Sequence, residues 1–159
     1  MDFSELTEPE RRARVEEALR MGEELRKTKE YDKGIDILVE ALQYGVEKAK
    51  IYFRLGNIYF DAGKLEHAEY AYRRAIDLNP NHINAHHNLS VVLRKQGKLS
   101  EAIRMRRIAE RLALQNPQRV QLTPEQIEQA RRVARRWLIG VGIAVGVVIA
   151  GMILLNLLF

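Results

Sequence analysis

Hydrophobic residues in the first two thirds of the chain recur at the spacing of amphipathic helices. Between residues 15 and 114, apolar side chains return every three or four positions, and charged side chains occupy many of the positions between them. This period of 3.6 residues is typical of helices that bury one face. The sequence Gly-Lys-Leu at 63–65 and at 97–99, and the pair Asn79–Pro80, interrupt it. The pattern predicts short helices joined by tight turns.

The hydrophobic pattern changes after Arg136. From Trp137 to Phe159 no side chain is charged, and only Asn156 is strongly polar. A helix of that length measures about 34 Å, against about 30 Å for the hydrocarbon core of a bilayer. A buried helix of a soluble domain rarely exceeds about 14 residues without a charge. Residues 137–159 are therefore predicted to form a transmembrane helix that serves as a tail anchor.

The helical region repeats itself. When the sequence is shifted by 34 residues, 49–80 aligns with 83–114, and a weaker copy precedes them at 15–46. Three pairs of small residues fix the register: Gly63 with Gly97, Ala68 with Ala102, and Ala75 with Ala109. A fixed period of this size is typical of solenoids, in which neighbouring repeats bury a continuous core.

The middle copy resembles the tetratricopeptide repeat family at every diagnostic position, namely Tyr52, Leu55, Gly56, Tyr59, Ala68, Tyr72, Ala75 and Pro80. Gly56 and Ala68 are small where two helices must approach closely, and Pro80 prevents the second helix from continuing. Terminal repeats differ because one face lacks a neighbouring repeat. We attribute to this end effect the departures from the pattern, which are Lys29 and Gly34 in the first copy and Ser90, Arg106 and Leu114 in the third.

A further helix is predicted after Pro117. Thr123 suits a helix cap, Pro124 suits the first helical position, and Gln126 completes a capping box. No Gly or Pro separates this segment from the hydrophobic run, so cap and anchor are expected to be one helix. The predicted fold is all-α, a three-repeat solenoid with a capping helix that continues into a single-pass transmembrane helix. Its parts are a helix start at 1–14, repeats at 15–48, 49–82 and 83–116, a cap at 123–136 and the span at 137–159.

The net charge of +5 is concentrated beside the predicted span. Residues 131–136 carry four arginines and no acid, whereas the preceding residues are close to balance. The positive-inside rule places such a flank, and with it the repeats, on the cytoplasmic side. The layout also resembles the mitochondrial fission adaptors, but no basic residue follows the span, so a bacterial plasma membrane is expected. The expected headgroup-level collar consists of Arg131, Arg132, Arg135, Arg136 and Trp137.

The sequence offers little for chemistry. His82 and His86 have the spacing of a metal-binding pair on a helix, but the chain has no cysteine and no acidic residue between 78 and 99. No phosphate-binding loop, nucleophile elbow or carboxylate pair is present. We therefore expect no enzyme activity, no metal, no cofactor and no small-molecule substrate. The basic stripe of Arg104, Arg106, Arg107 and Arg111 lacks aromatic residues between the arginines, which favours contact with the cap (Glu125 and Glu128) or with acidic lipid over nucleic acid.

The resemblance implies binding of a protein segment in the concave groove lined by the first helix of each repeat. The expected site in the second and third repeats comprises Lys50, Phe53, Arg54, Asn57, His87 and Asn88. Asn57 and Asn88 stand where chaperone-tail clamps of the family carry asparagine, but Phe53 replaces the clamp lysine. The predicted function is a membrane-tethered adaptor for a cytoplasmic protein.

The predicted span carries small residues four apart, at Gly142, Gly146 and Ala150. This spacing lets two membrane helices approach closely. It leaves open an alternative function, an accessory or assembly subunit of an integral membrane complex, held to other subunits or to its own copy through the membrane helix.

Overall fold

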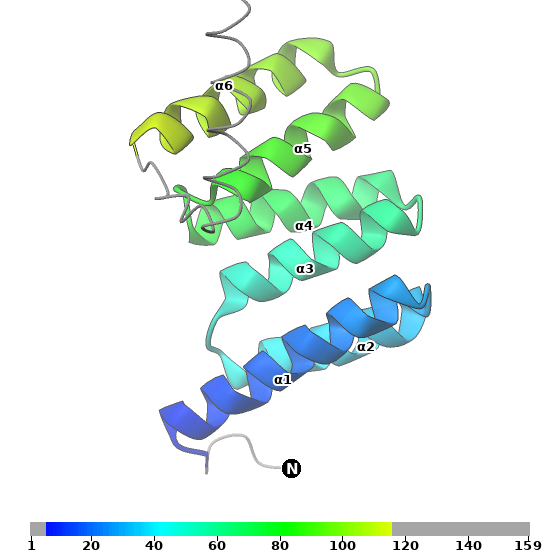
Figure 1. Ribbon diagram of the computed structural model, residues 1–159, viewed down its shortest axis with the longest axis vertical. Coiled ribbons are helices and arrows are strands. Elements are labelled where there is room, and N and C mark those ends of the chain that lie inside the picture. The colour runs from blue at the N-terminus through cyan, green and yellow to red at the C-terminus, as the bar shows by residue number, and fades with distance from the viewer. Residues whose placement is uncertain (1–5, 116–159) are drawn as a thin grey trace, which may run out of the picture. The chain divides into compact units, whose positions relative to one another are not determined.

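The computed structural model describes residues 6–115, which form six α-helices in three antiparallel pairs (Figure 1). The helices are α1 (Glu8–Lys27), α2 (Tyr31–Ala41), α3 (Lys48–Asp61), α4 (Leu65–Leu78), α5 (Ile83–Lys95) and α6 (Leu99–Gln115), with one 3-10 turn, η2 (Leu42–Tyr44). The pairs stack in chain order, and the described residues contain no strand. The predicted all-α solenoid of three helix pairs is confirmed.

The 34-residue register of the sequence is also the register of the structure. The first helix of each pair ends at Lys27, Asp61 or Lys95, and the second begins at Tyr31, Leu65 or Leu99. Helix α4 ends at Leu78, where Asn79 is extended and the predicted stop, Pro80, follows. The described residues 6–115 belong to one compact unit.

The turns inside the helix pairs require a left-handed residue. Gly63 and Gly97 fill this position with φ of 74° and 78°, and Lys29 fills it in the first repeat with φ of 64°. Glycine adopts this conformation without steric cost, whereas a residue with a Cβ is strained there. The departure at Lys29 thus leaves the turn unchanged in shape and makes the first repeat locally less stable.

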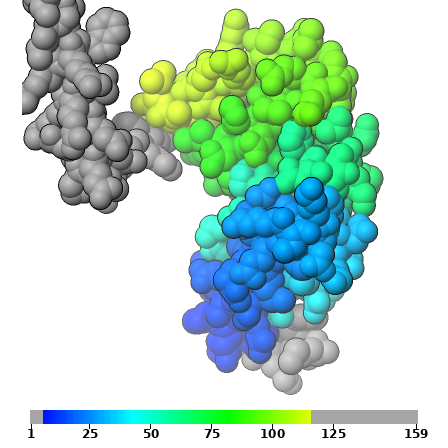
Figure 2. Space-filling view, turned by 45° about the vertical axis from the view of Figure 1, so that its right-hand side comes forward, coloured from blue at the N-terminus to red at the C-terminus, as the bar shows by residue number. Residues whose placement is uncertain are grey.

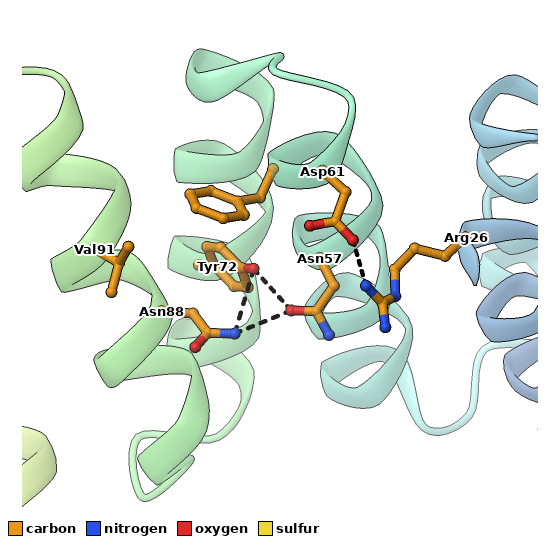
Figure 3. A pocket seen from close by; sticks show the side chains of 7 residues that line it. Arg26, Asn57, Asp61, Tyr72, Asn88 and Val91 are labelled. Carbon is orange, nitrogen blue, oxygen red and sulfur yellow. Dashed lines mark hydrogen bonds and ion pairs between the residues drawn. The ribbon is translucent and has the colours of Figure 1, made fainter. Parts of the chain in front are cut away.

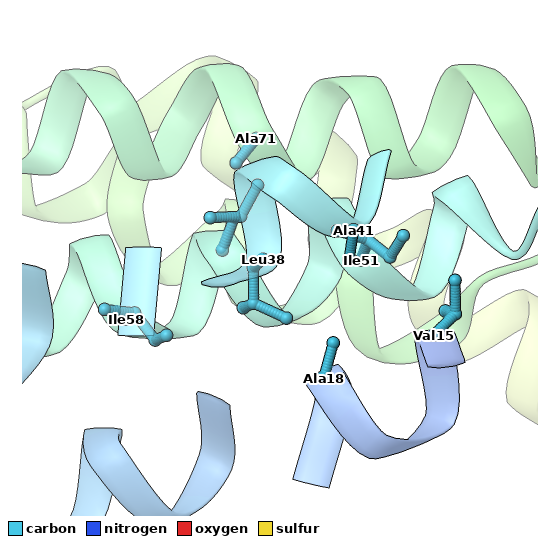
Figure 4. Packing of buried hydrophobic residues seen from close by; sticks show 8 residues of the cluster. Val15, Ala18, Leu38, Ala41, Ile51, Ile58 and Ala71 are labelled. Atoms are coloured by element: carbon cyan, nitrogen blue, oxygen red, sulfur yellow. The ribbon is translucent and has the colours of Figure 1, made fainter. Parts of the chain in front are cut away.

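Two hydrophobic clusters form the core. The first joins α1, α2 and α3 through Val15, Leu38, Ile51 and Ile58, each at most 1% exposed (Figure 4). The second joins the remaining helices, and its buried members are Ala68, Tyr72, Leu89, Val92, Leu93, Ala102 and Met105. Each cluster crosses a boundary between repeats, so neighbouring repeats bury surface that a single helix pair would expose.

Gly56 allows the close helix contact that the sequence predicts. A Cβ placed on this residue would lie 2.5 Å from Cε1 of Tyr72, a ring that is 1% exposed. In the first repeat the corresponding pair is Gly22 and Leu38, where the same Cβ would lie 3.0 Å from Leu38 Cγ. The larger ring in the second repeat therefore depends more strictly on the glycine.

Several predictions concern residues outside the described range. These are the cap at 123–136, the span at 137–159, the collar of Arg131, Arg132, Arg135, Arg136 and Trp137, and the small residues Gly142, Gly146 and Ala150. Within residues 6–115, no helix is long and apolar enough to cross a membrane. The anchor therefore stays a prediction.

Candidate partner-binding groove

A pocket of about 210 Å³ opens between the first helices of the three repeats (Figure 3). Helix α1 contributes one lining residue, α3 contributes three, α4 contributes one and α5 contributes two. They are Arg26, Asn57, Phe60, Asp61, Tyr72, Asn88 and Val91. The pocket is thus built where the family places its groove, and it draws on all three repeats.

Three polar side chains form a hydrogen-bonded group on one wall of this pocket. The Tyr72 hydroxyl donates to Asn57 Oδ1 at 2.7 Å, and Asn88 Nδ2 donates to the same oxygen at 3.0 Å (Figure 3). Burial raises the pKa of Tyr72, so the phenol stays neutral and remains a donor. Since Tyr72 is packed on Gly56, its hydroxyl position is fixed by the core.

Two amide groups of this wall are left for a ligand. Asn57 Nδ2 and Asn88 Oδ1 make no hydrogen bond within residues 6–115. One is a donor and the other an acceptor, which is the pair that a peptide backbone requires. Val91 and Phe60 supply apolar surface in the same pocket. The wall can therefore hold an extended chain by its backbone while a side chain enters the pocket.

The opposite wall is ionic. Arg26 of α1 forms an ion pair with Asp61 of α3, and it also contacts Glu23 at 2.7 Å. Glu23 in turn lies 3.2 Å from Arg54. The hydrogen bond from Arg26, followed by the charges of Arg26 and Arg54, lowers the pKa of Glu23 despite its partial burial. These four side chains neutralise one another, so this wall presents little net charge to a ligand.

The structure brings together some of the sequence-predicted site residues and separates others. Asn57 and Asn88 meet at the pocket, as described above, whereas Arg54 is paired with Glu23. Lys50 lies 2.9 Å from Glu47, and His87 is exposed on α5. The binding role of all these residues stays a prediction.

Phe53, one of the expected groove residues, is only partly exposed. The ring is half-buried against the second hydrophobic cluster, with its centre 6.0 Å from that of Tyr72 and 4.6 Å from that of His82. The ring thus packs on a cluster that joins the second repeat to the third. Less of the ring is therefore available to a partner than the sequence register predicts.

Sequence reasoning missed four residues of the pocket or gave them another role. Tyr72 was assigned to packing alone, and Arg26, Phe60 and Val91 were not assigned to the groove. Phe60 and Val91 each follow a predicted asparagine by three residues, which places them on the same helix face. That spacing was the available signal. No comparable signal exists for the hydroxyl of Tyr72, because its contact crosses between two helices.

The histidines at the start of α5 have structural contacts. His82 Nδ1 accepts a hydrogen bond from the Ala85 amide at 3.3 Å, and burial lowers the pKa of His82. His86 is 5% exposed, and its Nε2 donates to the Pro80 carbonyl at 2.9 Å. The described residues contain no group of three His, Cys, Asp or Glu that could hold a metal ion.

Comparison with known families confirms the class of repeat. Two tetratricopeptide repeat models match the chain, one at residues 49–82 and one at residues 71–104. The chain therefore contains tetratricopeptide repeats, as the sequence pattern predicts. No curated protein sequence matches the chain significantly.

Solved structures with the same fold include MamA and a secretion chaperone. The crystal structure of MamA has a TM-score of 0.61 at 23% identity over 65% of this chain. Residues 41–end of MamA from Desulfovibrio magneticus RS-1 give 0.60 at 23% identity, over 65% of this chain and 59% of that one. The type III secretion translocator chaperone SycD from Yersinia enterocolitica gives 0.60 at 16% identity, over 76% of this chain and 86% of that one. The chain spans 60% of the first MamA structure. These likenesses establish the fold.

Proposed function

We propose that this protein is a non-enzymatic adaptor that holds an extended segment of a protein partner in the groove between α3 and α5. The observation that carries the proposal is the pair of unused amide groups on Asn57 and Asn88, held by the Tyr72 hydroxyl beside a pocket to which Phe60 and Val91 add apolar surface. Tetratricopeptide repeats are protein-binding scaffolds, and SycD, which shares the fold, is named as a chaperone of translocators. Both facts support a protein partner.

We also propose that residues 137–159 anchor the adaptor in a membrane, with the repeats on the cytoplasmic side. The support is the uncharged run itself and the four arginines that precede it. An anchored chain should resist extraction by alkaline carbonate. In inverted membrane vesicles its repeats should be digested by added protease, and protection of the repeats would refute this orientation.

The groove is tested by a variant that changes the ligand-facing groups and spares the fold. Asn88→Ala removes the unused acceptor but keeps the bond between Tyr72 and Asn57. Asn81→Ala is the matched control, because Asn81 lies in the exposed turn before α5 and outside the pocket. Partners are first identified by pull-down of the full-length chain from detergent-solubilised native membranes. Their affinity should then fall about 10-fold or more for Asn88→Ala and should not change for Asn81→Ala.

The double variant Arg54→Glu with Asn57→Ala would be a less selective test of the groove. Asn57 bonds Tyr72 and Arg54 pairs with Glu23, so this double variant also disturbs contacts between repeats. Val91→Lys is a better second test, because the longer side chain would occupy the pocket. Unchanged partner affinity in both Asn88→Ala and Val91→Lys would refute the groove.

The alternative function, a subunit held through its membrane helix, is favoured by the spacing of Gly142, Gly146 and Ala150. Gly146→Leu in the full-length chain distinguishes the two functions, since a large residue on that face would keep membrane helices apart. If Gly146→Leu abolishes capture and Asn88→Ala does not, the subunit function replaces the adaptor function.

A further inference from the structure

Helix α6 carries basic and aliphatic side chains on the face that lies opposite its buried side. Ala102, Met105 and Ala109 are buried and define the inner side. With 3.6 residues per turn, the residues that point the other way belong to one continuous strip. We call this strip the α6 outer face; it consists of Ile103, Arg104, Arg107, Arg111 and Leu114, all of them exposed.

The α6 outer face carries three positive charges and no negative one. Arg104 reaches Glu101 only at 3.5 Å, and its side chain is 67% exposed. No carboxylate within residues 6–115 forms an ion pair with Arg107 or Arg111. The arginines of α1 differ, since Arg12 pairs with both Glu8 and Glu47. The guanidinium groups of Arg107 and Arg111, and in part that of Arg104, are therefore available to an anion outside the described residues.

The aliphatic residues of the same face indicate which kind of anionic partner it suits. Ile103 is 53% exposed and Leu114 is 81% exposed, and they flank the arginines. Exposed aliphatic side chains among basic ones are typical of a helix that lies at the headgroup level of a bilayer. Residues 99–115 include no aromatic side chain on which a base could stack, which disfavours nucleic acid.

We propose that the α6 outer face binds the surface of a membrane rich in anionic lipid. This inference rests on the proposed anchor, because an anchored chain holds α6 near the bilayer at a high effective concentration. Each arginine near an anionic surface strengthens the contact by about fivefold, so three of them contribute about 100-fold. Ile103 and Leu114 add contact with the acyl boundary. The repeats would then lie against the bilayer in anionic membranes and stand away from it in neutral ones.

The absence of cysteine makes the test direct. The full-length Ile103→Cys variant is labelled with a polarity-sensitive fluorophore and placed in lipid nanodiscs, either of pure phosphatidylcholine or with about one third phosphatidylserine. The anionic discs should shift the emission to the blue and allow quenching by spin-labelled lipid, and 0.5 M salt should reverse both effects because it screens the charges. A label on Glu16→Cys, an exposed position on α1, should show neither effect.

Charge reversal supplies the decisive comparison. Arg104→Glu, Arg107→Glu and Arg111→Glu together should weaken the lipid contact about 100-fold and abolish the blue shift. The control triple, Arg14→Glu, Lys27→Glu and Lys48→Glu, makes the same change in net charge at exposed sites outside α6 and should retain it. The proposal is overturned if emission from position 103 is equal in both lipids, as it would be if the face served an acidic protein, or if the α6 triple variant behaves like the control.

Flotation of proteoliposomes in alkaline carbonate reports on the anchor separately. A chain that floats but shows no lipid-dependent emission would refute the α6 proposal and retain the anchor. A chain that carbonate strips, yet that shows the blue shift before stripping, would refute the anchor and support α6 as a surface-binding helix in its own right.

Discussion

The first helices of neighbouring repeats are bridged in two different ways. Between α1 and α3 the bridges are ionic, with Glu23 facing Arg54 at 3.2 Å and Arg26 facing Asp61. Between α3 and α5 the bridge is neutral, because Asn88 donates to Asn57 at 3.0 Å. In the ionic bridge, the charged donors and acceptors pair with one another. The neutral bridge leaves two amide groups unused beside a pocket, and this is why we place the partner there.

The residues that pack beneath the two bridges differ as well. Tyr72 of the second repeat corresponds to Leu38 of the first, 34 residues earlier in the chain. Tyr72 brings a hydroxyl to the α3–α5 boundary, where it fixes Asn57, whereas Leu38 brings only methyl groups. The packing residue beneath the second boundary thus helps to hold a neutral polar group in place, whereas the residue beneath the first cannot.

The largest effect is expected at the glycine beneath the ring. In Gly56→Ala the new Cβ would lie 2.5 Å from Cε1 of Tyr72, and a ring that is 1% exposed has no room to move aside. Overpacking of this kind costs about 1–3 kcal/mol. We expect the free energy of unfolding to fall by about 2 kcal/mol, measured by urea titration with far-UV circular dichroism.

The first repeat supplies the control. In Gly22→Ala the contact is 3.0 Å to Leu38 Cγ, and the better helix propensity of alanine contributes about 1 kcal/mol in return. We expect a net change within about 0.5 kcal/mol. Equal losses in the two variants would show that Tyr72 is no more constrained than Leu38, and the proposed difference between the repeats would be lost.

The sequence predicts the packing within each helix pair well and the residues of the groove less well. Gly56, Ala68 and Pro80 act through local sterics, and their spacing is visible in one chain. The Arg26–Asp61 and Glu23–Arg54 pairs join residues about one repeat apart. The periodic pattern of the sequence does not predict which of these residues will pair. The half-burial of Phe53 was missed for a similar reason, since the cluster on which it packs includes residues of the next repeat. Contacts inside a repeat follow from its pattern, whereas contacts across a boundary depend on both neighbours.

The second prediction separates the hydroxyl of Tyr72 from its ring. Tyr72→Phe keeps the packing on Gly56 and removes the donor that holds Asn57 at 2.7 Å. The bond between Asn88 and Asn57 remains, so no buried group loses every partner. We expect a loss of about 1 kcal/mol in stability. Partner affinity should fall as well, because Asn57 is then free to rotate. A variant with normal partner affinity would show that the hydroxyl does not organise the groove.

The third prediction concerns the turn of the first repeat. Lys29 holds φ of 64°, a conformation that Gly63 and Gly97 adopt in the other two repeats. Lys29→Gly should therefore stabilise the protein by between about 0.5 and 1 kcal/mol, the part of the strain that remains after the added flexibility of the unfolded chain. Native-state hydrogen exchange should slow in α1 and α2 and stay the same in α5 and α6. A uniform change along the chain would contradict the local origin of the effect.

The smallest effect is a dependence on pH that only the ionic bridge should show. The contacts of Glu23 with Arg26 and Arg54 hold its folded-state pKa below the ordinary value of 4.5. The stability that Glu23 contributes is therefore complete above pH 4.5 and is lost as the pH falls through the lowered folded-state pKa. Glu23→Gln should cost about 0.5 kcal/mol at pH 7, and this difference from the wild type should shrink toward pH 3. Glu66→Gln, at an exposed position with no ion pair among the described residues, is the control and should change little at either pH. Asn57 and Asn88 do not titrate, so Asn88→Ala should have the same effect on stability across this range. If its effect also varied with pH, the two boundaries would be coupled, and the contrast between an ionic and a neutral bridge would no longer explain where the partner binds.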